Sequence, residues 1–192
     1  MDDIVLMTRN FASRTLGDDV VDGFPHARRV RKTALALAAK LGGDIKTIEL
    51  SAYLHDIAFE STNMSTHAID SADKAAAFLK GIKCPQSLRI AVQKIIKLHE
   101  KENWDLSEKP KTIEEKIIYD AETAESLTPR GLLSHISVLK DLKQTNTQIL
   151  KSLDTFISQS HDSLFFDQTK NMVEYNYRLI SEFIRAAKKD VL

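Results

Sequence analysis

The sequence predicts an all-α protein that folds as a single domain of about eight or nine helices. Apolar residues recur at three- and four-residue spacing through most of the chain, which is the period of an amphipathic helix. Only 6 Gly and 4 Pro interrupt this pattern. A chain of 192 residues with 43% hydrophobic content is long enough to bury one substantial core.

Local signals mark where several of these helices begin. Pro25 falls in the first turn of the second helix, where the missing N–H costs nothing. Asp44 is an expected N-cap, and Thr112 with Glu115 three residues later has the pattern of a capping box. The expected helices cover residues 2–16, 25–41, 45–58, 67–80, 85–100, 112–127, a segment starting at 129, 145–158 and 168–189.

The composition limits the classes of partner and location. No linker or repeat divides residues 1–192, so we expect a core of residues 20–130 with the helices of 131–192 packed on it. The 27 Lys and Arg balance the 27 Asp and Glu, which argues against a nucleic-acid partner. Cys84 is the only cysteine, which excludes an intramolecular disulfide. Since neither a long apolar run nor a signal-peptide pattern occurs, we expect no membrane contact and a cytoplasmic location.

Ionisable residues interrupt the apolar faces of five predicted helices. They are His26, the adjacent pair His55 and Asp56, His67, His99 and Asp120. Burial of an unpaired carboxylate costs several kcal/mol, on the order of 3 or more, and an unsatisfied polar group costs about 1–3 kcal/mol. Each residue alone is explained as well by a hydrogen bond in the core. Together they favour a bound divalent cation, which would offset the carboxylates and accept the imidazole nitrogens.

A ligand set of imidazoles and carboxylates without thiolates limits the metal and its chemistry. It suits Zn, Fe, Mn, Co or Ni and disfavours Ca, and Mg also stays open. Such a site leaves coordination positions for water, whose pKa a metal lowers, and for a substrate oxygen. Hydrolysis of a phosphate ester is the reaction that this arrangement favours.

The order of these residues resembles the HD-domain metal-dependent phosphohydrolase superfamily. The likeness rests on His26 in DGFPHARRV, His55-Asp56 in AYLHDIA and Asp120 in IEEKIIYDAETAESL. It implies an all-α HD-domain fold in which His26, His55, Asp56 and Asp120 hold the metal. It also implies that His55 and Asp56 are central to catalysis.

The sequence further resembles a subgroup of stand-alone HD hydrolases with additional histidines. HAIDSADKAAAFL supplies His67 and IIKLHE supplies His99, which by this likeness hold a second metal or contact the substrate phosphate. Many relatives continue the doublet as HDIGK, whereas this chain reads HDIAFE, so Phe59 or Glu60 occupies the place of the lysine. Phosphate recognition must therefore come from elsewhere.

Two further residues are expected substrate contacts. Glu122 follows Asp120 in DAE, where relatives often read DAD. Arg29 belongs to the basic run of residues 28, 29, 31 and 32 on the helix of His26, and a solvated helix face explains that run as well. His135 and His161 fit no such pattern and are expected to be ordinary surface or turn residues.

The predicted function is metal-dependent hydrolysis of a phosphoester or phosphoanhydride of a small molecule, most simply a nucleotide. The alternatives are a cyclic-nucleotide or second-messenger phosphodiesterase and a non-catalytic HD module that binds nucleotide or metal to regulate a partner. The aromatic residues Tyr175, Tyr177 and Phe183 are expected in the core or in a homodimer contact, and Trp104 lines an entrance or anchors its loop. The sequence leaves substrate, metal identity, oligomeric state and pathway open.

Overall fold

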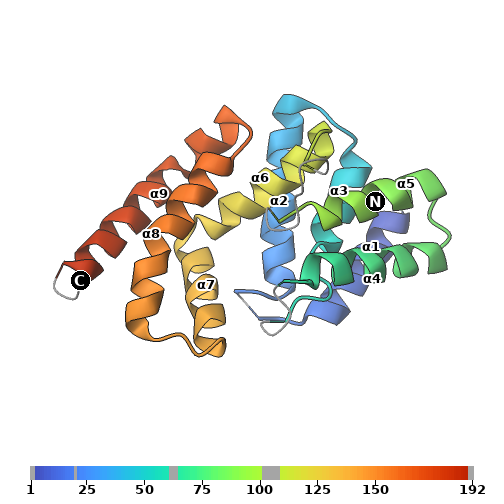
Figure 1. The fold of residues 1–192 in the computed structure, drawn as a ribbon. Coiled ribbons are helices and arrows are strands. Elements are labelled where there is room, and N and C mark those ends of the chain that lie inside the picture. The colour runs from blue at the N-terminus through green and yellow to red at the C-terminus, as the bar shows by residue number, and fades with distance from the viewer. Residues whose placement is uncertain (1–2, 20, 61–64, 101–108, 190–192) are drawn as a thin grey trace. The chain divides into compact units, whose positions relative to one another are not determined.

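The computed structural model describes residues 3–19, 21–60, 65–100 and 109–189 (Figure 1). Within these ranges the chain forms nine helices and no strand, which confirms the predicted all-α class. The helices are α1 (Asp3–Leu16), α2 (Phe24–Leu41), α3 (Ile45–Leu54), α4 (His67–Gly81), α5 (Gln86–Lys97), α6 (Ile113–Ser126), α7 (Pro129–Asp141), α8 (Asn146–Ser163) and α9 (Asp167–Lys188). No helix among the described residues is both long and apolar enough to cross a bilayer.

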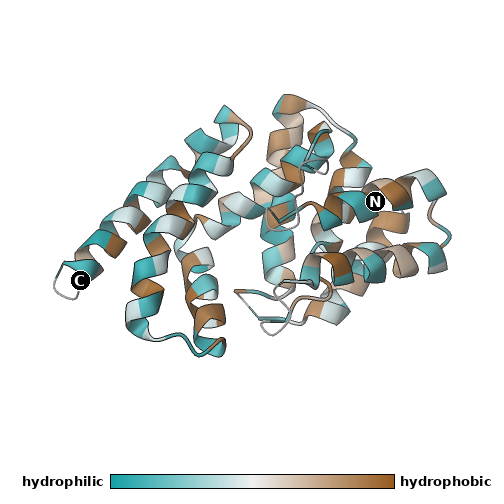
Figure 2. Cartoon of the chain, in the orientation of Figure 1, coloured by the Kyte–Doolittle hydropathy of each residue, from teal (hydrophilic) through white to brown (hydrophobic). Residues whose placement is uncertain are grey.

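The first of two compact units contains α1 to α5 and the beginning of α6, over Met1–Ala121. Its core includes Leu50 and Leu54 of α3, Leu79 of α4 and Ile96 of α5, all fully buried. In this unit α2 packs along α3, and α4 packs along α5 (Figure 1). Figure 2 shows the apolar residues of these helices as brown bands between teal polar ones. Besides α2, helix α3 contacts α1, α4 and α5, and it therefore forms the centre of the unit.

The second unit contains the end of α6 and α7 to α9, over Glu122–Leu192. It has a core of its own, centred on Leu153, Ile157 and Ile180, where α8 runs antiparallel to α9 (Figure 1). The division at residues 121 and 122 falls inside α6, so the single domain with residues 131–192 packed on a core stays a prediction. Tyr175 and Phe183 on α9 are 76% and 57% exposed, and their role in a homodimer also stays a prediction.

The helix starts follow the predicted caps. Asp44 accepts a hydrogen bond from the Thr47 amide at 2.7 Å and so caps α3. The Thr112 hydroxyl accepts from the Glu115 amide at 3.3 Å, and the Glu115 carboxylate accepts from the Thr112 amide at 3.0 Å. This reciprocal pair is the predicted capping box of α6. The sequence thus determines these starts locally, through a single side chain and the amides that it satisfies.

Three helix ends differ from the prediction. Helix α3 ends at Leu54 instead of residue 58, and α5 ends at Lys97 instead of residue 100. Helix α8 continues to Ser163, through the segment that was expected to form a turn. The predicted loop of residues 101–111, with Trp104, lies mostly outside the described residues. The two early ends bear on function because His55 and His99 lie within two residues after them.

Gly131 is expected to tolerate no side chain. A Cβ at this position would lie 2.3 Å from the Glu125 carbonyl oxygen and 2.6 Å from the Ser126 Cα, both of which are backbone atoms. Because α7 would have to shift away from the end of α6, Gly131→Ala should lower the free energy of unfolding by about 2 kcal/mol. Thermal and urea unfolding monitored by circular dichroism measure this loss. Gly81→Ala, where a Cβ meets open space, is the control that should leave stability within about 1 kcal/mol of the original.

His135 makes stability depend on pH. Its ring stacks on Phe156 at 3.7 Å between centroids, so the expectation of an ordinary surface residue is wrong. Burial lowers the pKa of His135 to about 4. Since the unfolded chain has a pKa of about 6.5 at this residue, it binds more protons than the folded chain between about pH 6.5 and 4. The free energy of unfolding should therefore fall as the pH falls through this window.

The contribution of His135 is isolated by comparison with His135→Phe, which keeps the stacked ring and removes the titration. The difference in unfolding free energy between the two proteins should change by about 1–2 kcal/mol between pH 7 and pH 4.5, after allowance for partial solvent screening. Urea unfolding at four pH values measures it. A difference that does not vary with pH would contradict the expected effect.

Candidate metal centre

The sequence predicted that the His55-Asp56 doublet lies inside a helix. The doublet lies instead in a tight turn that directly follows α3. His55 is the C-terminal cap of α3. The Phe59 amide donates to the Asp56 carbonyl at 2.9 Å, and the Ala58 amide donates to the Ser71 hydroxyl of α4 at 3.0 Å. In a continued helix adjacent side chains would diverge by about 100°. The two side chains nevertheless meet, with His55 Nε2 3.3 Å from Asp56 Oδ2.

One group of ligand atoms brings α2 to this turn. His26 Nε2 lies 3.1 Å from His55 Nε2 and 3.6 Å from Asp56 Oδ2. His55 Nε2 lies 3.3 Å from the same Asp56 oxygen. Both histidines are buried, with His55 fully enclosed. These three residues form the first group, whose ligand atoms are close enough to share a cation.

A second group lies on the other oxygen of the same carboxylate. His67, the first residue of α4, places Nε2 3.5 Å from Asp56 Oδ1, and His99 places Nε2 3.3 Å from it. The two imidazole nitrogens lie 3.4 Å apart. Asp56 therefore stands between two sets of histidines and presents one oxygen to each.

Backbone carbonyls fix the orientation of two of these imidazoles. His55 Nδ1 donates to the Ala52 carbonyl at 3.0 Å, and His99 Nδ1 donates to the Ile96 carbonyl at 2.6 Å. Each acceptor lies three residues earlier, at the end of a helix that has just terminated. A proton held on Nδ1 leaves the Nε2 lone pair of the neutral ring directed at Asp56. The Ala52 and Ile96 carbonyls therefore orient these two rings.

The electrostatics of the cluster demand a positive charge. Burial by itself raises the pKa of Asp56, but the charges and hydrogen bonds of His55 and His99 outweigh it and hold that pKa well below its ordinary value. Burial lowers the pKa of His99, and the Asp56 carboxylate more than reverses this. Asp56 Oδ1 is buried and accepts no well-directed hydrogen bond. An anionic oxygen facing imidazole lone pairs is stabilised only by protons or by a cation, so these residues fit a divalent metal.

Asp120 is fully buried on α6 but belongs to neither three-residue group. Two contacts anchor the start of its helix in the first unit. The Lys94 ammonium of α5 lies 2.6 Å from the Glu115 carboxylate, and Glu114 accepts a hydrogen bond from the Asp44 amide at 2.9 Å. The burial of Asp120 agrees with its predicted place on an apolar helix face, while its role as a metal ligand stays a prediction.

Comparison with known proteins assigns the chain to a family. The HD domain family matches residues 23–126, more than half of the chain and the whole stretch from His26 to Asp120. The chain belongs to the HD-domain family. No curated protein matches the sequence significantly.

Solved structures share this HD fold over nearly the whole chain. Lin1889 from Listeria innocua is 21% identical, with a TM-score of 0.73 over 100% of this chain and 98% of that one. An HD-superfamily hydrolase from Bacillus thuringiensis is 23% identical, with a TM-score of 0.66 over 97% and 95% of the two chains. YpgQ from Bacillus subtilis, whose structure contains ADP, is 17% identical, with a TM-score of 0.69 over 97% of each chain. At these identities the likeness establishes the fold alone.

Neither of the two predicted substrate contacts belongs to the ligand groups of this HD domain. Arg29 donates from Nη2 to the Val21 carbonyl at 2.8 Å and lines a separate basic pocket. Glu122 follows Asp120 by two residues on α6, so the two side chains leave the helix about 200° apart. Their contact with substrate stays a prediction.

Among the described residues, two neighbours of His67 border the second group. Glu100 places a carboxylate oxygen 3.5 Å from His67 Nε2, and this residue was missed by the sequence argument. Its position directly after His99 was the available signal. Phe59 packs edge-on against the His67 ring at 5.2 Å, so the residue that replaces the common lysine does border the cluster. The second group thus has an acid and an aromatic ring beside it.

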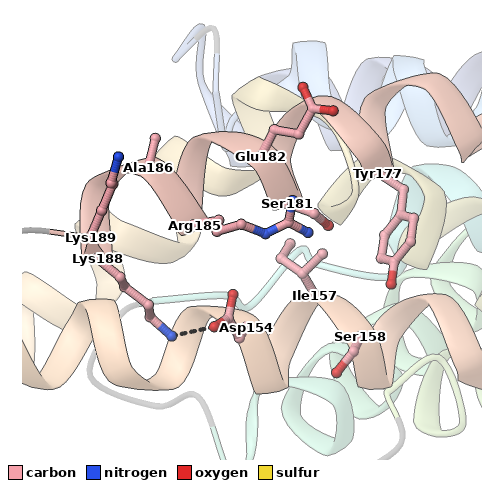
Figure 3. A pocket seen from close by; sticks show the side chains of 10 residues that line it. All are labelled: Asp154, Ile157, Ser158, Tyr177, Ser181, Glu182, Arg185, Ala186, Lys188 and Lys189. Carbon is pink, nitrogen blue, oxygen red and sulfur yellow. Dashed lines mark hydrogen bonds and ion pairs between the residues drawn. The ribbon is translucent and has the colours of Figure 1, made fainter. Parts of the chain in front are cut away.

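A groove in the second unit is lined by none of the residues of the two ligand groups. It measures about 920 Å³ and runs between α8 and α9 in the second unit (Figure 3). Its lining includes the ion pair between Asp154 and Lys188, together with Tyr177 and Arg185, and no histidine. The chemistry of the side chains, and not the size of the cavity, therefore locates the candidate site.

Proposed function

We propose that the protein is a metal-dependent hydrolase of a phosphoester or phosphoanhydride of a small molecule. The observation that carries this proposal is the Asp56 carboxylate, which lies within 3.3–3.6 Å of four imidazole nitrogens, two on each oxygen. A carboxylate shared in this way is the arrangement of a two-ion centre. Divalent ions held there supply an activated water and polarise a phosphoryl oxygen.

The residues of the chain supply the remaining requirements. His55 and His99 are held by backbone carbonyls, so their ligand atoms are oriented before metal arrives. Asp56 stays anionic at neutral pH because its pKa is low. The enclosing helices exclude bulk water from His55, His67 and His99, which strengthens every charge interaction inside the cluster. Mn, Co, Ni, Fe, Zn and Mg all remain compatible with this donor set.

A nucleotide is the substrate class that we favour. The support is the structural neighbour YpgQ, a protein of the same fold over nearly its whole length that was crystallised with ADP. We expect such a substrate, and no nucleic acid, to occupy the site.

A second candidate is a cyclic-nucleotide or second-messenger phosphodiesterase. The observation that favours it is the second ligand group, in which His67 and His99 converge on Oδ1 of Asp56. Two ions can stabilise both the attacking and the leaving oxygen of a phosphodiester. The two candidates share one site and differ in the bond that is cleaved.

The test combines metal analysis with a substrate screen. The protein is purified without chelator, and its metal content is measured by elemental analysis. Nucleoside mono-, di- and triphosphates, cyclic nucleotides and generic phosphoesters are then assayed with Mn, Co, Ni or Mg. We expect bound metal and release of phosphate or pyrophosphate, or ring opening for the second candidate. Protein that contains no metal and stays inactive with every ion would overturn both.

A further inference from the structure

We propose that the outer face of α2 is a binding site for a small polyphosphate anion, separate from the His/Asp cluster. The site is a pocket of about 390 Å³, a volume typical of small-molecule sites. Its lining consists of Pro25, Arg28, Arg29, Arg31, Lys32 and Tyr53. This proposal does not depend on the hydrolase proposal.

Charge is concentrated in this pocket. Four of its six lining residues are cationic and none is acidic, in a chain whose 27 basic and 27 acidic residues balance overall. Arg28 and Lys32 are exposed and lie four residues apart on α2, a spacing at which like charges repel. The first turn of α2 contains no acid, so the positive end of its helix dipole is not offset there. An anion bound between Arg28 and Lys32 would relieve their mutual repulsion.

Two of the four cations are already held in place. Arg29 donates to the Val21 carbonyl at 2.8 Å. Arg31 pairs with Glu49 and lies over the Tyr53 ring at 5.4 Å from its centroid. Arg28 and Lys32 take part in no ion pair or hydrogen bond with the described residues, and both extend from the exposed side of the helix. The pocket thus combines two ordered guanidinium groups with two cations that are available to a ligand, which lowers the entropy cost of binding.

Helix geometry separates this pocket from the metal centre. His26 and Arg28 leave α2 about 200° apart, and Lys32 lies on the same side as Arg28. His26 is buried against His55, whereas Arg28 and Lys32 face solvent. An anion bound to Arg28 and Lys32 is therefore not the phosphate that would meet Asp56. The small volume and the neutral chain favour a compact anion over a nucleic acid.

The experiment is calorimetric titration of the full chain with inorganic triphosphate and with ATP, in buffer that contains EDTA. Four proteins are compared: the original, Arg28→Ala/Lys32→Ala, Asp56→Ala and the control Lys40→Ala/Lys80→Ala. The control removes two exposed cations of the same unit, of which Lys40 lies about 12 Å along α2 from Lys32. Circular dichroism verifies that each variant is folded.

We expect the Arg28→Ala/Lys32→Ala variant to bind triphosphate at least about tenfold more weakly, because two charge-assisted contacts are lost. The control and Asp56→Ala should stay within about twofold of the original protein. Tighter binding of ATP than of triphosphate would assign the ligand as a nucleotide, and equal binding would assign the polyphosphate alone. Unchanged binding in the double variant, or loss of binding in Asp56→Ala, would overturn the proposal. So would tighter, Arg28-dependent binding of a single-stranded oligonucleotide.

Discussion

Replacement of Asp56 by alanine is expected to release all bound metal and to lower the rate of hydrolysis by more than about a hundredfold. This loss exceeds the one that follows removal of a group that only hydrogen-bonds to a metal ligand. The reason is that both ligand groups use this carboxylate, one through Oδ2 and the other through Oδ1. Loss of the side chain removes one ligand from each group and also the negative charge that offsets the cations. Elemental analysis and the rate of phosphate release measure the two effects on the same preparation.

The matched control for this variant is Asp73→Ala. Asp73 is an exposed carboxylate of α4 in the same unit, and it accepts a hydrogen bond from Gln93 at 3.0 Å. Its replacement should leave metal content and rate unchanged. Asp56→Asn, which keeps the shape and removes the charge, should behave like Asp56→Ala. Full metal content in Asp56→Ala would show that the centre lies elsewhere in the chain.

The sequence predicted most of the residues that meet in the His/Asp cluster because buried polar residues are conspicuous in apolar helices. His26, His55, His67 and His99 each interrupt an apolar face, and the structure brings all four to Asp56. This succeeds because burial of an ionisable group is costly without a partner, so several such groups indicate a shared partner. The helix starts were equally predictable, since Asp44 and Thr112 act on amides only three residues away.

The remaining features depend on contacts that no local pattern contains. Nothing in the letters HDIAF stops a helix, and α3 ends at Leu54 while the Ala58 amide bonds to Ser71 of another helix. The sharing of Asp56 between two groups depends on histidines from several segments of the chain and could not be inferred from spacing within one helix. Glu100 was missed because its side chain is 31% exposed and lies on no apolar stripe. Tertiary contacts thus determined the details that matter most for the chemistry.

Replacement of His26 or of His67 by alanine is expected to remove one metal ion each and to leave the other. His26 belongs only to the first group, and His67 belongs only to the second. A protein that holds two ions per chain should retain about one in either variant and none in Asp56→Ala. Titration with Mn or Co, followed by elemental analysis after desalting, gives the stoichiometry. His161→Ala, in α8 of the second unit, is the histidine control and should retain both ions.

The rates of the same variants distinguish one catalytic ion from two. If both ions act on the same phosphoryl group, His26→Ala and His67→Ala should each lower the rate by more than about a hundredfold. The double variant should then be little slower than either single one, because residues that act as a unit lose their effects together. A single catalytic ion predicts instead that one variant is inactive while the other keeps most of its activity. The shared Asp56 carboxylate, with its oxygens 3.3 Å from His55 and from His99, leads us to expect the first result.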